Sequence, residues 1–167
     1  TVSTPTPTPQ LKTNRQPVKR TNNHIDWGCE VLSDKTTACG HPADDRMSTP
    51  EELFTAVNNY RVAHGLSPVE KNDTLCSIAQ NRASELVSNG ALDGHAGFSK
   101  YAHNQAEFDD MAELLYGGVQ NQRGVHIVEW GWARSQTGHK QSMENPKWQN
   151  GCGGIAGLFA VFILGKR

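Results

Sequence analysis

Apolar positions near the start of the main part of the chain repeat at helical spacing. Leu53, Val57 and Tyr60 lie three or four residues apart within STPEELFTAVNNYRVAHG. A threonine and a proline precede this stretch, two glutamates open it and a glycine follows it, all of which are helix-end signals. The pattern predicts a helix that begins after Thr49 and ends near His64.

A second stretch, DTLCSIAQNRASELVSNG, repeats the same periodicity. We expect Asp73 to cap this helix and Asn89 with Gly90 to end it. The side chains predicted to face the core are Leu75, Ile78, Ala79, Arg82, Ala83 and Leu86.

The second half of the chain combines short helices with strands. Residues 107–118 (EFDDMAELLYGG) and 125–136 (VHIVEWGWARSQ) are predicted as helices, with Val125, Val128 and Trp132 on one side of the latter. Residues 150–167 are rich in β-branched, aromatic and glycine residues, which favours strands covered on both faces. Helices first and strands last predict an α+β fold.

Composition divides the chain into three parts. Residues 1–23 hold Thr, Pro, Asn, Gln and basic residues, too little apolar surface to fold, so we expect a flexible Thr/Pro-rich basic stalk. Residues 24–47 are predicted to form a small disulfide-stapled extension, and residues 48–167 the main domain. The positive charges of the stalk could touch an anionic cell envelope, although a solvated linker is the simpler interpretation.

Charge and hydropathy exclude two classes of protein. The formal net charge is -1, with 16 basic and 17 acidic residues, which argues against a nucleic-acid binder. The longest apolar run, Ile155 to Leu164, has ten residues, whereas a membrane-spanning helix needs roughly 20. No signal peptide is visible, and the opening TVSTPTPTPQ is typical of a mature or trimmed terminus.

Four cysteines allow three pairings. We favour Cys29 with Cys39, because CEVLSDKTTAC can close a hairpin-like loop, which leaves Cys76 with Cys152. An even number of cysteines without C-x-x-C spacing favours disulfides and an oxidising compartment over a zinc ribbon. Four unpaired thiols are the alternative.

Three weaker possibilities for chemistry come from the residues alone. Ser135 and His139 would meet if one helix carried both, which would suggest a serine nucleophile with its base, but Gly138 is expected to break that helix. Cys76 as a thiol nucleophile is disfavoured by its place inside a helix that faces a core. An irregular zinc site is the third possibility, with the ligands His24, Cys29, Cys39 and His41.

Several motifs, in order, resemble the CAP superfamily, which covers cysteine-rich secretory, antigen-five and pathogenesis-related proteins. The resemblance covers about residues 50–165. Within the superfamily, the chain is similar to the bacterial SCP-domain branch. The motifs that carry it are the N-x-x-R of the first helix (Asn58 and Arg61), GLSPV, the alanine-rich second helix, the histidine before Gly97 and Phe98, the Ala-Glu-Leu step, and a tryptophan-led helix that ends in Ser-x-x-Gly-His.

This resemblance implies an α-β-α sandwich with a central antiparallel sheet and a large open cleft. It places His95, Glu113 and His139 together in that cleft, although they are far apart in the sequence. The second acidic residue of related cleft sites falls where this chain has Ser135, and Glu129 is out of register. Two imidazoles and one carboxylate, with a hydroxyl beside them, would suit zinc or another divalent cation, and we expect no organic cofactor.

The resemblance also bears on function. It implies a secreted or envelope-tethered binding module with a lipid, glycan, protein or small-molecule ligand, and no nucleic acid. The alternative is a metal-dependent hydrolase of the peptidase or esterase type in which Glu113 would be catalytic, because the same ligand trio occurs in hydrolytic zinc sites. We expect a binding role rather than catalysis.

Overall fold

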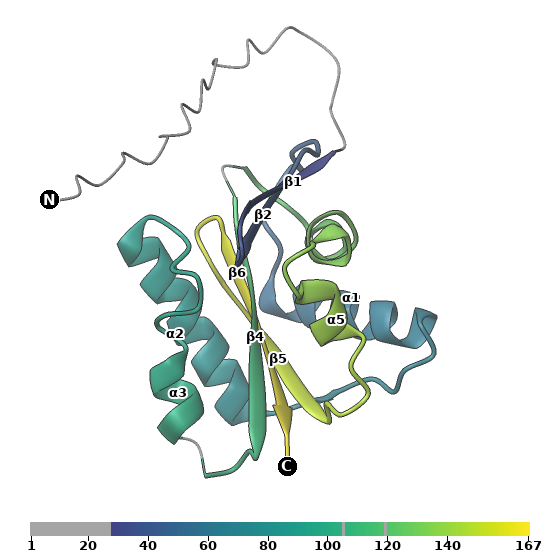
Figure 1. The fold of residues 1–167 in the computed structure, drawn as a ribbon, viewed down its shortest axis with the longest axis vertical. Helices are drawn as coiled ribbons and strands as arrows, with labels where there is room; N and C mark the ends of the chain where they lie inside the picture. Colours follow the sequence, from purple (N-terminus) through teal and green to yellow (C-terminus); the bar gives the residue numbers. More distant parts are fainter. Residues whose placement is uncertain (1–27, 105, 119) are drawn as a thin grey trace, which may run out of the picture.

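The protein is a three-layer α-β-α sandwich, described here from a computed structural model that places residues 28–104, 106–118 and 120–167. Figure 1 shows the sheet edge-on, with α2 (Asp73–Asn89) and α3 (Ser99–Asn104) on one side and α1 (Pro50–Ala63) and α5 (His139–Met143) on the other. The predicted α+β sandwich is confirmed. The stalk predicted for residues 1–23 lies outside the described residues.

The central sheet has the strand order β3-β5-β6-β4. Its main strands are β4 (Asp110–Gly117), β5 (Asn150–Ala156) and β6 (Phe159–Lys166), and they pair antiparallel as predicted. The two-residue β3 (Glu70–Lys71) joins β5 in parallel. Since β4 is the last strand in this order, its outer edge has no neighbouring strand in the sheet.

Strand β6 divides the core into two clusters. Ala160, Phe162 and Leu164 face the α1 side, whereas Val161 and Ile163 face the α2 side. All five are fully buried, so this run of successive apolar residues is a strand covered on both faces. This confirms the interpretation of residues 150–167.

The ends of α1 explain two sequence signals. The Thr49 side chain accepts a hydrogen bond from the Glu52 amide, and Glu52 accepts one from the Thr49 amide, which together make a capping box. Asn58 exchanges two hydrogen bonds with the Val69 backbone, and Arg61 donates to the Ser67 carbonyl. The N-x-x-R motif therefore fixes the loop that leads into β3.

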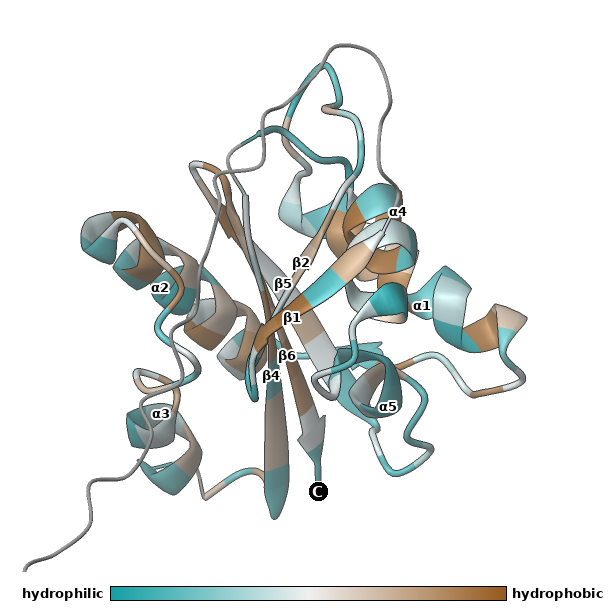
Figure 2. Cartoon of the chain, turned by 45° about the horizontal axis from the view of Figure 1, so that its top comes forward, coloured by the Kyte–Doolittle hydropathy of each residue, from teal (hydrophilic) through white to brown (hydrophobic). Residues whose placement is uncertain are grey.

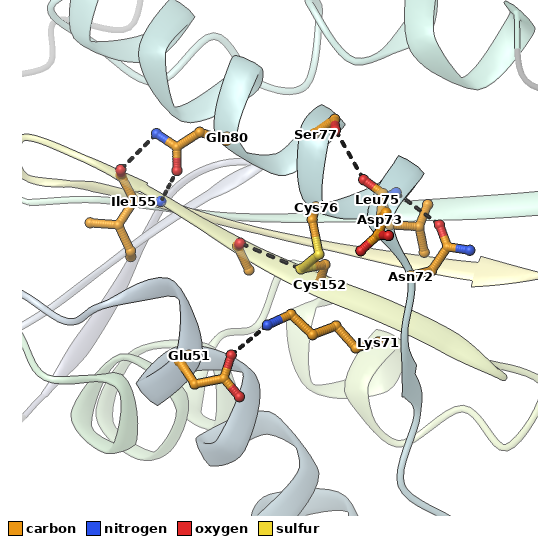
Figure 3. The surroundings of a disulfide bond; sticks show 11 residues. Glu51, Lys71, Asn72, Asp73, Leu75, Cys76, Ser77, Gln80, Cys152 and Ile155 are labelled. Atoms are coloured by element: carbon orange, nitrogen blue, oxygen red, sulfur yellow. Dashed lines mark hydrogen bonds and ion pairs between the residues drawn. A yellow bond between two sulfur atoms is a disulfide. The ribbon is translucent and has the colours of Figure 1, made fainter.

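Helix α2 is joined to β5 by the predicted Cys76–Cys152 disulfide (Figure 3). Its N-cap is Asn72, whose side chain accepts the Leu75 amide, so the prediction of Asp73 as cap was wrong by one residue. Gly90 ends the helix in the left-handed conformation, as predicted. A Cβ atom at Gly154 would lie 2.3 Å from the Ala79 backbone, so the helix and the strand are in backbone contact.

The predicted helix over residues 107–118 is wrong. Residues Asp110–Gly117 form β4, with Leu114 packed on the α1 side and Leu115 on the α2 side. A short strand that is buried on both faces carries apolar residues at successive positions, and periodicity alone does not separate it from a helix.

Residues 124–134 are helical but irregular. A single turn, α4 (Gly124–His126), passes into a π-helical turn η1 (Ile127–Gly131) and a 3₁₀ turn η2 (Trp132–Arg134). Val128 and Trp132 are buried as predicted, whereas Val125 is 50% exposed. The wider π turn changes the helical phase, so a regular 3.6-residue period assigns Val125 to the wrong face.

The N-terminal part of the described chain is a hairpin, β1 (Cys29–Ser33) and β2 (Thr36–Cys39), which both views place between α2 and α5 (Figure 1 and Figure 2). Cys29 and Cys39 are bonded as predicted, with a Cα–Cα distance of 4.1 Å. They occupy directly opposed positions of the two strands. None of the helices in the described part of the chain is long and apolar enough to cross a membrane.

The two disulfides should differ in their contribution to stability. Replacing Cys76 and Cys152 by alanine should lower the free energy of unfolding by about 4 kcal/mol, and replacing Cys29 and Cys39 by about 3 kcal/mol, because the closed loops differ in length. The sequence separations are 76 and 10 residues. Urea unfolding of both double variants measures this difference, and a larger loss for the Cys29–Cys39 pair would contradict it.

Candidate functional site

His95 and His139 come from opposite layers and meet beside β4. His95 lies in the bend after α2, and His139 is the first residue of α5. Their ring centroids are 6.3 Å apart. Because β4 is the last strand of the sheet, side chains from the two helical layers can meet around its edge. The two histidines predicted to share a cleft are therefore neighbours.

The bend that carries His95 has a constrained backbone. His95 is the one described residue other than glycine with a positive φ, 71°. Asp93 holds this conformation, because its carboxylate accepts hydrogen bonds from the amides of His95 (3.1 Å) and Gly97 (2.9 Å). Such a conformation is unfavourable for a side-chain-bearing residue and persists only where the surroundings enforce it.

The Glu113 carboxylate contacts the His95 ring. One carboxylate oxygen lies 2.9 Å from His95 Nδ1, and the other accepts a 2.7 Å hydrogen bond from Arg82 Nε. The Glu113 side chain is fully buried, while that of His95 is 32% exposed. The carboxylate thus orients the imidazole, and it presents neither oxygen to the cleft.

Arg82 is the centre of this cluster. Its guanidinium is fully buried and hydrogen-bonds Glu113, Asp93 and Glu85. Burial opposes its charge, but the three carboxylates outweigh burial and raise the pKa of Arg82. A Cβ atom at Gly97 would lie 2.1 Å from Arg82 Nη1, so this position has no room for a side chain.

Glu85 connects the cluster to solvent. It accepts hydrogen bonds from Arg82, Lys100 and the Tyr101 hydroxyl. Burial opposes the charge of its carboxylate, but these donors lower the pKa of Glu85 to about 2. The carboxylate is therefore ionised at neutral pH.

His139 is held by a loop rather than by a continuing helix. Ser135 has an extended backbone and Gly138 a positive φ of 101°, so the predicted helix break is present. The chain nevertheless returns far enough for Ser135 Oγ to lie 2.8 Å from His139 Nδ1. Thr137 donates its amide to the same oxygen at 3.2 Å. Burial, together with the nearby His95, lowers the pKa of His139 to about 4, so its imidazole is neutral at neutral pH.

A cavity of about 350 Å³ opens next to these residues. Its floor includes Trp132, whose indole donates to the Leu115 carbonyl on the edge of β4, and its lining includes Ser135 and His139. The hairpin and the two residues that follow it also line the cavity, with every residue from Lys35 to His41. Thr37 contacts both the Ser135 and the Thr137 hydroxyls, at 3.5 and 3.4 Å.

The structure places four predicted site residues around one cleft. His95, Glu113, Ser135 and His139 are brought together, but within residues 28–104, 106–118 and 120–167 no group of three His, Cys, Asp or Glu side chains is arranged to hold a metal ion. Metal binding stays a prediction, and the geometry assigns Glu113 to the support of His95.

Two of the weaker possibilities are excluded. Disulfide bonds engage Cys76 and both Cys29 and Cys39, which removes the proposed thiol nucleophile and both thiolates of the irregular zinc site. His24, the fourth residue of that site, lies outside the described residues.

Sequence reasoning missed Arg82 and Asp93 as functional residues. Arg82 was assigned to the inner face of its helix, which is correct. A long cation on a core-facing position is almost never buried without a charged partner, and that was the available signal. The sequence offered no means to choose the partners of Arg82. Glu113, for example, lies on a segment that was predicted to be a helix, so its position beside α2 could not be foreseen.

Comparisons with known proteins agree with this fold. The sequence profile described as the cysteine-rich secretory protein family, CAP, matches residues 54–149, more than half of the chain. No curated protein matches the chain.

Three solved structures are similar in fold. An extracellular SCP-domain protein from Bacillus anthracis has a TM-score of 0.58 and 16% identity over 71% of this chain and 40% of its own. An outer surface protein from Borrelia burgdorferi has a TM-score of 0.57 and 21% identity over 70% of this chain and 91% of its own. A cysteine-rich secretory protein from Staphylococcus aureus has a TM-score of 0.59 and 18% identity over 81% of this chain and 43% of its own. This chain therefore spans less than half the length of the Bacillus and Staphylococcus proteins.

The buried ion cluster should make stability acid-sensitive. Because the pKa of Glu85 is lowered from 4.5 to about 2 on folding, its charge stabilises the fold above pH 4.5, and this contribution is lost as the pH falls toward 2. Glu85→Gln should lower the free energy of unfolding on the order of 2 kcal/mol at neutral pH, after allowance for partial exposure.

The measurement is urea unfolding of wild type and Glu85→Gln at a series of pH values. The difference between the two proteins should shrink steadily below pH 4.5. Glu129→Gln, at an exposed position, is the matched control and should show a small difference at every pH. A Glu85→Gln difference that stays constant with pH would show that the carboxylate charge is not stabilising.

Proposed function

This chain belongs to the cysteine-rich secretory protein (CAP) family, and we propose that it acts outside the cytoplasm as a binding module whose cleft holds a divalent cation between His95 and His139. Zinc is the preferred ion, because it accepts imidazole nitrogen ligands in sites that remain open to solvent. The proposal concerns binding of the cation and of a ligand beside it, rather than turnover.

The observation that carries the proposal is the way both rings are held. Nδ1 of His95 faces the Glu113 carboxylate at 2.9 Å, and Nδ1 of His139 faces Ser135 Oγ at 2.8 Å. Metal-binding histidines are typically oriented by an oxygen that accepts the N–H of the second ring nitrogen. In that arrangement each ring keeps Nε2 available as a ligand atom.

The residues fit zinc as a two-imidazole site. Glu113 does not fit as a direct ligand, since its oxygens are engaged by Arg82 and His95 and its side chain is fully buried. Glu113 and Ser135 would instead fix the two rings. With two protein ligands, a tetrahedral ion retains positions for water or for a group of the bound ligand.

Two further observations support an extracytoplasmic role. All four cysteines are in disulfides, which persist in oxidising compartments. The similar solved structures include proteins described as extracellular, outer surface and secretory.

The hydrolase alternative has less support. Its general base would be Glu113, and that carboxylate is enclosed by Arg82 and His95 instead of facing the cavity. A general base has to lie within hydrogen-bond reach of the proton that it removes from the water or substrate. The binding role is therefore the better supported of the two proposals.

Calorimetric titration with zinc tests the proposal. Wild type should bind one ion per chain, and His95→Ala or His139→Ala should each weaken binding more than Ser135→Ala, for which a loss of about 10-fold to 100-fold is expected of an orienting residue. Binding should also weaken as the pH falls toward about 4, because protons then compete with zinc for the His139 imidazole, whose pKa is lowered to about 4.

His103→Ala is the matched control, since His103 is an exposed histidine on α3. Its zinc affinity should equal that of wild type. No heat of binding with wild type at neutral pH, or equal affinity in the double variant His95→Ala, His139→Ala, would refute the cation site.

A further inference from the structure

Strand β2 has one edge that is not used in the hairpin. Gly40 donates its amide to the Gly28 carbonyl, and β1 and β2 are antiparallel with Glu30 opposite Ala38. Hydrogen-bonded pairs alternate along an antiparallel ladder, so the main-chain groups of Thr37 and Cys39 point away from β1. Among the described residues, neither Thr37 nor Cys39 makes a backbone hydrogen bond outside the strand ladder.

This unused edge faces the cavity. A strand that turned one face to a cavity would contribute alternate residues to its lining, because successive side chains point to opposite faces. The hairpin and the two residues after it instead contribute the continuous run from Lys35 to His41, which includes all of β2. On the other side, the end of β4 and the glycine after it contribute the continuous run from Leu115 to Gly118. Two strand edges therefore line one cavity of about 350 Å³, a size within the usual range of ligand pockets.

The charge of the lining is one-sided. Lys35 is the single lysine, arginine, aspartate or glutamate among the described residues that line the cavity, and its side chain is at the exposed rim. Leu92, Leu115 and Trp132 give the interior an apolar floor. A ligand that carries a carboxylate next to an apolar group matches this distribution of charge.

We propose that the cavity binds an acidic peptide in extended conformation, which adds as a strand to the free edge of β2 and places a carboxylate near Lys35. The amides and carbonyls of Thr37 and Cys39 form a row of alternating donors and acceptors with the spacing of a β-strand. Another extended chain can pair with such a row through its own carbonyls and amides. Alternate side chains of the peptide would then point toward Trp132 and Leu115.

This inference rests on the proposed function only in that it uses the same cleft. The main-chain and carboxylate contacts of the peptide come from the hairpin, outside residues 54–149 that match the family profile. They do not need His95, so peptide binding should persist in the presence of a chelator and in His95→Ala. If the wild-type protein bound the peptide but did not bind zinc, the cation site would be refuted and the peptide site would stand.

The probe is a fluorescein-labelled pentapeptide, Thr-Val-Thr-Val-Glu with an amidated C-terminus, measured by fluorescence anisotropy with the full chain. Three companions isolate the interactions: the same peptide N-methylated at alternate amides, a Gln peptide with an amidated C-terminus, and a Gln peptide with a free C-terminal carboxylate. The last two distinguish a side-chain carboxylate from a terminal one.

The N-methylated peptide should bind at least about 10-fold more weakly than its parent, because it cannot donate the main-chain hydrogen bonds. The amidated Gln peptide should also bind more weakly than the Glu peptide. Recovery of affinity by the free terminal carboxylate would assign the Lys35 contact to a chain end.

Two protein variants test the same contacts from the other side. Thr37→Pro removes the amide that faces the cavity and leaves the β1–β2 ladder intact, while Thr37→Ala removes the hydroxyl and keeps the amide. The proline variant should bind the Glu peptide about fivefold more weakly than the alanine variant. Lys35→Gln should weaken the Glu peptide selectively, and Lys166→Gln, outside the cavity, should not.

Wild-type protein with the N-methylated peptide decides the question even if a variant fails to fold. Equal affinity for the N-methylated peptide and its parent would overturn the inference, as would the absence of saturable binding of the parent peptide. Equal binding of the Glu and amidated Gln peptides would overturn the assignment to Lys35.

Discussion

The cleft of this protein depends on the hydrogen bonds of one buried guanidinium. Arg82 extends from α2 to carboxylates on three different segments, namely Glu85 on its own helix, Asp93 in the following bend and Glu113 on β4. A fully buried cation without these partners would be strongly destabilising, and the carboxylates would be equally unfavourable without the cation. The cluster therefore fixes the α2 layer, the His95 bend and the edge strand relative to one another.

From this fixed point the site follows from the order of the strands. Because β4 is at the end of the sheet, His95 from the α2 layer and His139 from the α1 layer can approach each other around its edge. The Trp132 indole covers part of that edge by donating to the Leu115 carbonyl. The cavity lies beside the indole, and the hairpin forms another part of its lining. An N-terminal element held by its own disulfide thus completes a cleft that the sandwich begins.

The helices α1 and α2, the strands of residues 150–167 and both disulfides could be predicted from the sequence, because each depends on local composition and spacing or on an even set of cysteines. Strand β4 could not, since a short segment covered on both faces carries no strand alternation. That error also hid the role of Glu113, which lies on the α2 face of β4 and reaches Arg82 only in the folded sheet. His95, Glu113 and His139 were grouped correctly through the family resemblance, whereas the support of one ring by Glu113 and the other by Ser135 is a property of the tertiary structure.

The central claim is that both imidazoles are oriented through Nδ1 so that Nε2 is free to bind. Long-range ¹H–¹⁵N NMR of the metal-free protein at neutral pH reports which nitrogen of each ring carries the proton. The account predicts the Nδ1–H form for His95, facing Glu113, and for His139, facing Ser135. A proton on Nε2 of either ring would contradict it, because that nitrogen would then have no lone pair to offer a cation.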